Sequence, residues 1–243
     1  MKLYVPPLAC ALLLTACGRS QPAAPGQNAD APPSESAEAL PEIPAMGQER
    51  RILALGDSLF AGYGLPSDQS YPVKLEAALR ARGVNARIAN AGVSGDTSAD
   101  GLARLDFTLN NQQRPPDLVI ISLGGNDMLR GLPPEQTRAN LDAILTELDR
   151  RKIRAVLMGM LAPPNMGADY RDKFDAIYPA LAKQHGAVLV PFFLQAVMGR
   201  PDLVQQDHIH PTRVGIERIV AATVDTVAGA LPKVSRAAPP PPR

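Results

Sequence analysis

Short apolar runs and longer amphipathic segments alternate along the middle of the chain. Residues 52–55 are four consecutive apolar side chains, and residues 117–123 form the most strand-like segment of the sequence. Runs this apolar are typical of strands buried on both faces of a parallel sheet. Further strands are expected at residues 85–91, 154–160 and 187–191.

The amphipathic segments between these runs predict helices. The clearest spans residues 133–151, where two prolines suit a first turn and four leucine and isoleucine side chains share one face. A short helix is expected to begin at Ser58. The other predicted helices cover residues 71–83, 98–110, 170–185 and 211–231, and an irregular stretch is expected at 161–169.

Strands that alternate with helices are typical of an α/β domain whose parallel sheet is covered on both faces. Because crossovers between parallel strands are right-handed, few topologies remain. We predict a three-layer αβα domain, flavodoxin-like, with a doubly wound five-stranded sheet of order 2-1-3-4-5. In such a fold the loops after the first three strands meet beyond their carboxyl ends. Ser58, Gly95 and Asn126 lie in those loops, so we expect them to come together.

The ends of the chain differ in composition from its middle. The N-terminal apolar run is too short to span a bilayer and reads as a signal peptide. It ends in Leu14-Thr15-Ala16-Cys17, which resembles a bacterial lipobox, where the cysteine becomes lipidated; an ordinary secretory signal is the alternative. The next segment is rich in Ala, Pro, Ser and Gln, which predicts a disordered tether. The expected organisation is a lipoprotein signal peptide (1–16), a tether (17–49), one folded domain (50–233) and a proline-rich tail (234–243).

Charge and cysteine content limit the classes of partner and the covalent links that the protein can have. The formal net charge is +1, from 25 Lys and Arg against 24 Asp and Glu, so no nucleic-acid partner is indicated. Cys10 falls in the segment that would be removed, which leaves the mature chain without a disulfide. We expect a periplasmic monomer that meets the membrane through lipidated Cys17. Gly18 follows that cysteine where inner-membrane retention usually requires aspartate, which favours the outer membrane.

Ser58 stands where a buried strand gives way to a helix. The N–H groups of a helix start can stabilise an oxyanion, so a nucleophile suits this position. A plain helix N-cap is the alternative. Residues 93–96 and Asn126 could likewise be ordinary loop and turn residues.

Asp207 and His210 are separated by three positions, which in a turn places both side chains on one face. This spacing suits a carboxylate that orients an imidazole. His208 should point elsewhere. A metal site at Asp207, His208 and His210 is the alternative, but no further Cys or His cluster supports it.

Four segments together resemble a known family. GDSLFAGYGL, AGVSGDTSADGLARL, GGNDMLRG and DHIHP are similar to blocks I, II, III and V of the SGNH, or GDSL, hydrolases, and to their bacterial thioesterase, arylesterase and lysophospholipase branch. The resemblance implies that Ser58 is the nucleophile, His210 its base and Asp207 the group that orients His210. It further implies an oxyanion hole made by the N–H groups of Ser58 and Gly95 and the amide of Asn126, with no metal or organic cofactor.

Two positions depart from that branch, because His208 stands where it often has glycine and Thr212 where it often has asparagine. The Gly-x-Ser-x-Gly elbow of the larger α/β-hydrolases is absent from the sequence.

We therefore predict a serine esterase that forms an acyl-enzyme on Ser58 and acts on aryl or short-to-medium acyl esters, with lysophospholipids and thioesters as further candidates. Met166 lies outside any predicted element and is the candidate for an acyl pocket. Alternatives are an acetyl esterase acting on cell-wall or polysaccharide sugars and a binding lipoprotein without catalysis. A flavodoxin-like phosphate binder is disfavoured, because the turn at Ser58 lacks a glycine- and threonine-rich cradle.

Overall fold

The computed structural model describes residues 47–233. The predicted signal peptide, Cys17, most of the predicted tether and the proline-rich tail lie outside the described residues.

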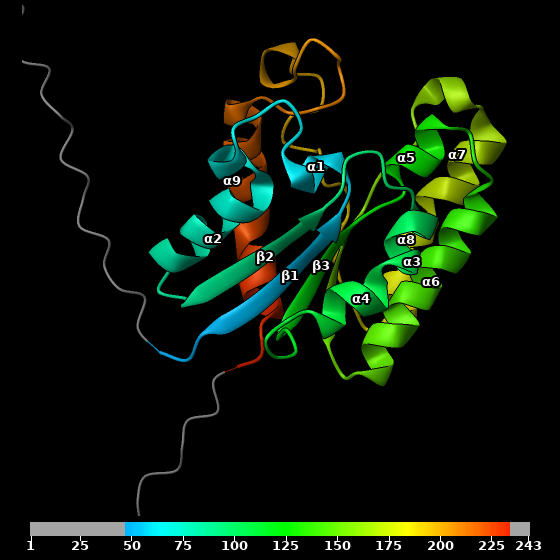
Figure 1. Ribbon diagram of the computed structural model, residues 1–243. Coiled ribbons are helices and arrows are strands. Elements are labelled where there is room, and N and C mark those ends of the chain that lie inside the picture. The colour runs from blue at the N-terminus through cyan, green and yellow to red at the C-terminus, as the bar shows by residue number, and fades with distance from the viewer. Residues whose placement is uncertain (1–46, 234–243) are drawn as a thin grey trace, which may run out of the picture. The chain divides into compact units, whose positions relative to one another are not determined.

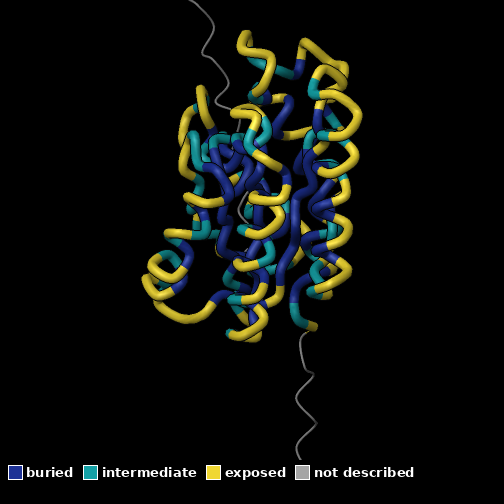
Figure 2. Tube along the Cα trace, turned by 90° about the vertical axis from the view of Figure 1, so that its right-hand side faces the viewer, coloured by how far each residue is buried: buried dark blue, intermediate teal, exposed yellow. Residues whose placement is uncertain are grey.

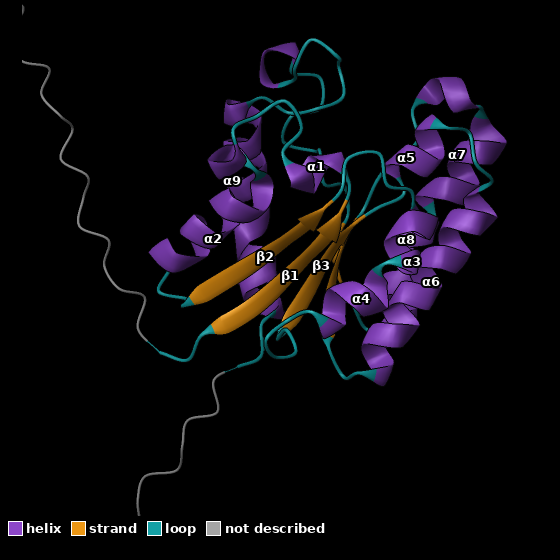
Figure 3. Ribbon diagram, viewed as in Figure 1, coloured by secondary structure: helices purple, strands orange, loops and turns teal. Residues whose placement is uncertain are grey.

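Five parallel strands form a single sheet in the order β2-β1-β3-β4-β5, which confirms the predicted topology (Figures 1 and 3). In register, Ile52 of β1 lies between Ile88 of β2 and Leu118 of β3. The two central strands are almost entirely buried, as their unbroken apolar runs require (Figure 2). The strands are β1 (Arg50–Gly56), β2 (Ala86–Gly92), β3 (Leu118–Ser122), β4 (Arg154–Met158) and β5 (Val188–Val190).

Helices cover both faces of this sheet. Helices α2 and α9 pack together on one face, and α3, α6 and α8 pack together on the other (Figure 1). Among residues 47–233, no helix has the length and apolar character needed to cross a bilayer. The helices are α1 (Ser58–Ala61), α2 (Tyr71–Ala81), α3 (Ser98–Ala103), α4 (Leu105–Asn110), α5 (Gly125–Leu129), α6 (Pro134–Arg150), α7 (Ala168–Asp175), α8 (Ile177–His185) and α9 (Arg213–Ala230).

Two segments predicted as single helices are broken. The segment expected at 98–110 divides into α3 and α4 at Arg104, whose φ of −99° and ψ of 1° leave the helical range. The segment expected at 170–185 divides at Ala176 into α7 and α8, and α7 begins at Ala168, within the stretch expected to be irregular. At the end of α7, Asp175 Oδ1 accepts a hydrogen bond of 2.8 Å from the Ala162 N–H, so this helix end is tied to the chain that follows β4. The short helix α5 was not predicted.

An aromatic cluster fixes the short helix α1 at the carboxyl edge of the sheet. The Phe60 ring stacks on Tyr71 of α2 at a centroid distance of 5.3 Å, and Phe193 meets Tyr71 edge-on at 4.8 Å. The Tyr71 hydroxyl is in turn within 2.8 Å of Thr223 Oγ1 on α9. All three rings are buried, so a helix of four residues is held by its packing rather than by its length.

Candidate active site

Ser58 is the first residue of α1 and directly follows the end of β1. Asp57, between the two elements, caps the helix, because its Oδ1 accepts a 3.0 Å hydrogen bond from the Leu59 N–H. The serine hydroxyl is thereby placed at the carboxyl edge of the sheet, beside the free N–H groups of a helix start.

The loop before α9 carries the histidine and is tied to the turn after α1. The Gln205 N–H donates to the His210 carbonyl at 2.7 Å, and Gln205 Nε2 donates to the Tyr63 carbonyl at 2.8 Å and to the Pro211 carbonyl at 2.9 Å. The Tyr63 ring lies against the His210 ring, with centroids 4.5 Å apart. The loop and the α1 segment are therefore one packed unit, and the sequence pattern did not reveal this role of Gln205.

Asp207, His210 and Ser58 form a chain of hydrogen bonds. His210 Nδ1 lies 2.6 Å from Asp207 Oδ2, and His210 Nε2 lies 2.8 Å from Ser58 Oγ. Asp207 Oδ1 also accepts the N–H groups of Ile209, at 2.9 Å, and His210, at 3.0 Å. Because an ionised carboxylate only accepts, Nδ1 carries the proton in this arrangement and Nε2 is left to accept the serine hydroxyl. The predicted spacing of Asp207 and His210 thus brings them together with a serine 152 residues away.

The Asp207 carboxyl stays ionised over the usual range of pH. Partial burial raises its pKa, but hydrogen bonds from the His210 N–H, the His210 ring and the Ile209 N–H outweigh this effect and lower the pKa to about 2.

Asp57 is a second carboxyl group in the site, and the sequence analysis did not single it out. Its side chain is 2 % exposed, and burial raises its pKa from 3.8 to about 6 although the Leu59 N–H and the nearby His210 ring act in the opposite direction. Its Oδ2 lies 3.4 Å from Asn126 Nδ2. The sequence feature that could have identified Asp57 is its position directly before Ser58, where an aspartate is a common helix N-cap.

The loops predicted to carry the oxyanion donors meet beside Asp57, the residue directly before Ser58. Asn126 Nδ2, on α5, donates a 2.9 Å hydrogen bond to the Asp96 carbonyl, so the loops after β2 and β3 are joined. Gly95 has a φ of +89°, a conformation that favours glycine. Within residues 47–233, the N–H groups of Ser58 and Gly95 donate to no other group and are available.

Two arginines hold the Gly95 loop in place. Arg104 Nε contacts Asp96 Oδ2 at 2.7 Å, and Arg104 Nη2 donates to the Gly56 carbonyl at 2.9 Å. Arg130 Nη2 donates to the Gly95 carbonyl at 2.6 Å. Arg104 thus links the end of β1 to the loop after β2. The residue that makes this link is also the one at which the expected helix breaks.

The structure shows the local setting of the two positions that depart from the resembled family. His208 has a φ of 60°, a conformation in which glycine is the usual residue. Thr212 is the N-cap of α9, where its Oγ1 accepts the Gly215 N–H at 3.2 Å, a role that asparagine fills equally well.

Met166 lies in a short 3₁₀-helix, Pro164–Met166, after β4 and is partly buried against the hydrophobic core. Its place in an acyl pocket stays a prediction. Met158 and Met160 are buried and belong to the core.

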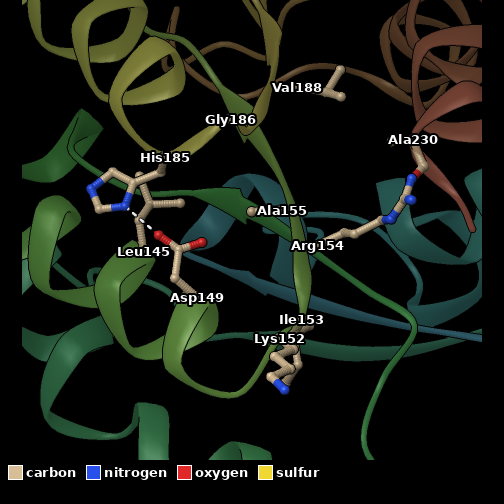
Figure 4. A pocket seen from close by; sticks show the side chains of 10 residues that line it. All are labelled: Leu145, Asp149, Lys152, Ile153, Arg154, Ala155, His185, Gly186, Val188 and Ala230. Atoms are coloured by element: carbon tan, nitrogen blue, oxygen red, sulfur yellow. Dashed lines mark hydrogen bonds and ion pairs between the residues drawn. The ribbon is translucent and has the colours of Figure 1, made fainter.

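A hollow of about 280 Å³ lies at the opposite, amino edge of the sheet (Figure 4). There His185 Nδ1 is 2.6 Å from Asp149 Oδ2 and His185 Nε2 is 2.7 Å from Asp142 Oδ1, which ties α8 to α6. Burial lowers the pKa of His185, but its hydrogen bonds to the two aspartates raise it overall. In the part of the chain that the structure describes, no three His, Cys, Asp or Glu side chains come together as a metal site.

A parallel α/β sheet with a serine, a histidine and an aspartate linked at its carboxyl edge defines a serine hydrolase. The sequence model of the GDSL-like Lipase/Acylhydrolase family matches residues 54–218, and the chain belongs to this family.

Similar proteins agree with this assignment. The arylesterase of Vibrio mimicus is 42% identical over 161 residues, which are 66% of this chain and 80% of that protein. The thioesterase 1/protease 1/lysophospholipase L1 of Escherichia coli K12 is 41% identical over 162 residues, 67% of this chain and 76% of that protein. The crystal structure of AlinE4, an SGNH-hydrolase family esterase, matches with a TM-score of 0.66 and 62% identity, and covers 77% of this chain and 99% of that one. The chain is therefore a GDSL-type ester hydrolase.

Proposed function

We propose that this protein is a lipid-anchored serine esterase that cleaves aryl and short-to-medium acyl esters through an acyl-enzyme on Ser58. The observation that carries the proposal is the hydrogen-bond chain from Asp207 through His210 to Ser58. The substrate range is supported by two similar proteins, the arylesterase of Vibrio mimicus and the thioesterase 1/protease 1/lysophospholipase L1 of Escherichia coli.

In the first half of the reaction, Ser58 Oγ attacks the carbonyl carbon of the ester while His210 Nε2 takes the hydroxyl proton. The bond from carbon to the leaving oxygen then breaks. Its electron pair stays with that oxygen, which receives the proton from His210, and an alcohol departs. In the second half, water replaces the alcohol, attacks the acyl-Ser58 with the same base, and releases a carboxylic acid.

Negative charge develops on the carbonyl oxygen in both halves. The available N–H groups of Ser58 and Gly95 and the Asn126 amide are the proposed donors to that oxygen. In the free protein Asn126 Nδ2 makes one short bond to the Asp96 carbonyl and a longer contact of 3.4 Å to Asp57. The longer contact is the weaker one, so an oxyanion can replace it. Loss of one such donor typically lowers kcat by about 10²–10³-fold.

A fluorophosphonate probe tests the assignment of the nucleophile. The mature protein should be labelled once, on Ser58, and Ser58→Ala should abolish labelling while the fold is retained. His210→Ala should lower ester turnover by at least about 10³-fold, because the serine is then left without a base, whereas His208→Ala should lower it by less than about tenfold. Labelling that persists in Ser58→Ala, or equal losses in the two histidine variants, would overturn the assignment.

The segment after β4 is the proposed wall for the acyl chain, because Met166 is partly buried there and Leu161 is exposed in the same segment. Met166→Asp should lower kcat/KM for octanoate esters at least about fivefold more than for acetate esters, since one or two methylenes in an apolar pocket are worth this much. A chain-length series of p-nitrophenyl esters measures the effect. Cleavage of acetates alone, with Met166→Asp neutral across the series, would instead favour the acetyl esterase.

The lipid anchor is the part of the proposal that concerns location. The lipobox-like sequence ending in Cys17 and the polar, proline-rich segment after it support a periplasmic domain tethered to the outer membrane. A coil of roughly thirty residues has an end-to-end distance of only about 30 Å, which keeps the domain close to the lipid surface.

A further inference from the structure

An apolar groove of about 390 Å³ lies beside the loop that carries His210, and none of the residues so far assigned to the reaction lines it. Two of its lining residues, His208 and Ile209, directly precede His210 in the chain. The apolar side chains of the lining are Phe192, Leu194, Val197, Met198, Val204 and Ile209.

The groove is built to be open rather than filled by the protein. Met198 is 62 % exposed and Ile209 is 42 % exposed, whereas Val197, which also lines the groove, is buried. His208 keeps a bulky side chain on the groove although its φ of 60° favours glycine. Exposed apolar side chains and a strained residue at one place are typical of a binding surface.

The groove lining carries one permanent charge, on Arg200. Arg200, which lines it, is paired with Asp202 through contacts of 2.9 Å and 3.1 Å. The one permanent charge of this lining is thus balanced by a neighbouring carboxylate in an exposed ion pair. The remaining walls are mostly apolar and suit a neutral hydrocarbon or aryl group.

The proton transfers made by His210 determine which part of an ester lies near the groove. His210 Nε2 must hand its proton to the leaving oxygen, so that oxygen has to come within hydrogen-bond distance of the imidazole. The carbonyl oxygen points instead toward the donors on the Gly95 and Asn126 side. The alcohol part of the ester thus leaves on the side of His210, whose loop also carries the groove residues His208 and Ile209.

We infer that the groove formed by the segment 192–209 binds the alcohol part of the ester, and that it selects neutral apolar leaving groups such as aryl or alkyl alcohols. The inference rests on the proposed esterase function and adds to it a leaving-group site that is separate from the Met166 segment.

A series of acetates that share one acyl group tests this inference on the purified mature protein. We expect kcat/KM to rise from methyl acetate to hexyl acetate. Met198→Asp should lower kcat/KM for hexyl acetate by about tenfold and for methyl acetate by less than about twofold, since a charge at the groove removes only the contact with the longer alcohol. Because all acetates give the same acetyl-enzyme, the rate of its hydrolysis should be unchanged.

Three control variants accompany Met198→Asp. Met198→Leu should retain the preference for hexyl acetate of the unaltered protein. Met198→Ala should lower this preference by a factor between those of Met198→Leu and Met198→Asp. Phe107→Asp, at another exposed apolar side chain, on α4, should change neither substrate. Equal kcat/KM ratios of hexyl to methyl acetate in Met198→Asp and the unaltered protein would overturn the inference.

The acyl series separates the two ends of the ester. The ratio of methyl hexanoate to methyl acetate should be the same in Met198→Asp as in the unaltered protein; if this ratio falls instead, the groove binds the acyl chain and the inference is wrong. If the unaltered protein hydrolyses no ester in either series, the proposed function itself fails, which is a distinguishable result.

Discussion

At the scale of single residues, a buried carboxyl group next to the proposed nucleophile has a measurable effect on stability. Burial raises the pKa of Asp57 from 3.8 to about 6, so its ionised form is disfavoured in the folded protein. Because the folded state binds the proton more tightly than the unfolded state, the contribution of Asp57 is most favourable below pH 3.8 and is lost as the pH rises through about 6. The difference corresponds to roughly 3 kcal/mol at neutral pH.

Asp57→Asn should therefore stabilise the domain at high pH. Asparagine keeps an oxygen that can accept the Leu59 N–H but carries no charge. We expect the free energy of unfolding to rise by about 2 kcal/mol at pH 8 relative to the unaltered protein, and to change little near pH 4. Urea unfolding at pH 4, 6 and 8 measures this difference. A difference between the two proteins that does not vary with pH would contradict the expectation.

Among secondary-structure elements, the break between α3 and α4 links the fold to the site. Arg104 leaves the helix and bridges Asp96 in the loop after β2 to the Gly56 carbonyl at the end of β1. The Asp96 carbonyl also holds the Asn126 amide. Arg104 is thus a positioning residue for the proposed oxyanion donors, although it need not contact the substrate.

Arg104→Gln should lower kcat by about 10–100-fold with less than about a threefold change in KM, because misplaced donors weaken binding of the transition state more than of the substrate. Steady-state kinetics with an aryl ester measure both constants, and circular dichroism checks the fold. The matched control is Arg151→Gln, which removes contacts with Glu147 and Asp106 on helices α6 and α4. An equal loss of kcat in Arg104→Gln and Arg151→Gln would show that Arg104 supports the fold in general and does not position the oxyanion donors.

The same elements explain how far the sequence predicts this protein. Strong apolar runs such as those of β1 and β3 are read correctly because burial on both faces leaves no room for polar residues. The helix at 98–110 was predicted without its break, because Arg104 and Asp96 meet only through tertiary contacts. The contact between Asp207 and His210 joins residues only three positions apart, so it could be predicted from the sequence. The raised pKa of Asp57 depends on residues far apart in the chain, among them His210 and Asp96. The groove near Met198 is formed within residues 192–209, whose irregular loop conformation the apolar pattern does not predict.

At the scale of the whole molecule, the proposed anchor predicts where the protein is found in the cell. Cys17→Ser should move the protein from the outer-membrane fraction to the soluble periplasmic fraction, since removal of the acyl chains leaves no other predicted anchor. Fractionation followed by immunoblotting measures the distribution. Ser58→Ala is the control and should remain in the membrane fraction, while an unchanged distribution of Cys17→Ser would refute the lipobox.

Both ends of the described chain emerge far from the serine. Strand β1 starts at Arg50 at the amino edge of the sheet, and α9 ends at Ala230, whose carbonyl accepts a 3.4 Å hydrogen bond from Arg154 at the start of β4 (Figure 1). Ser58 lies at the carboxyl edge. The enzyme can therefore be coupled to a bead, or fused to a display scaffold, through either terminus. The carboxyl edge of the sheet, with Ser58, would then face the medium.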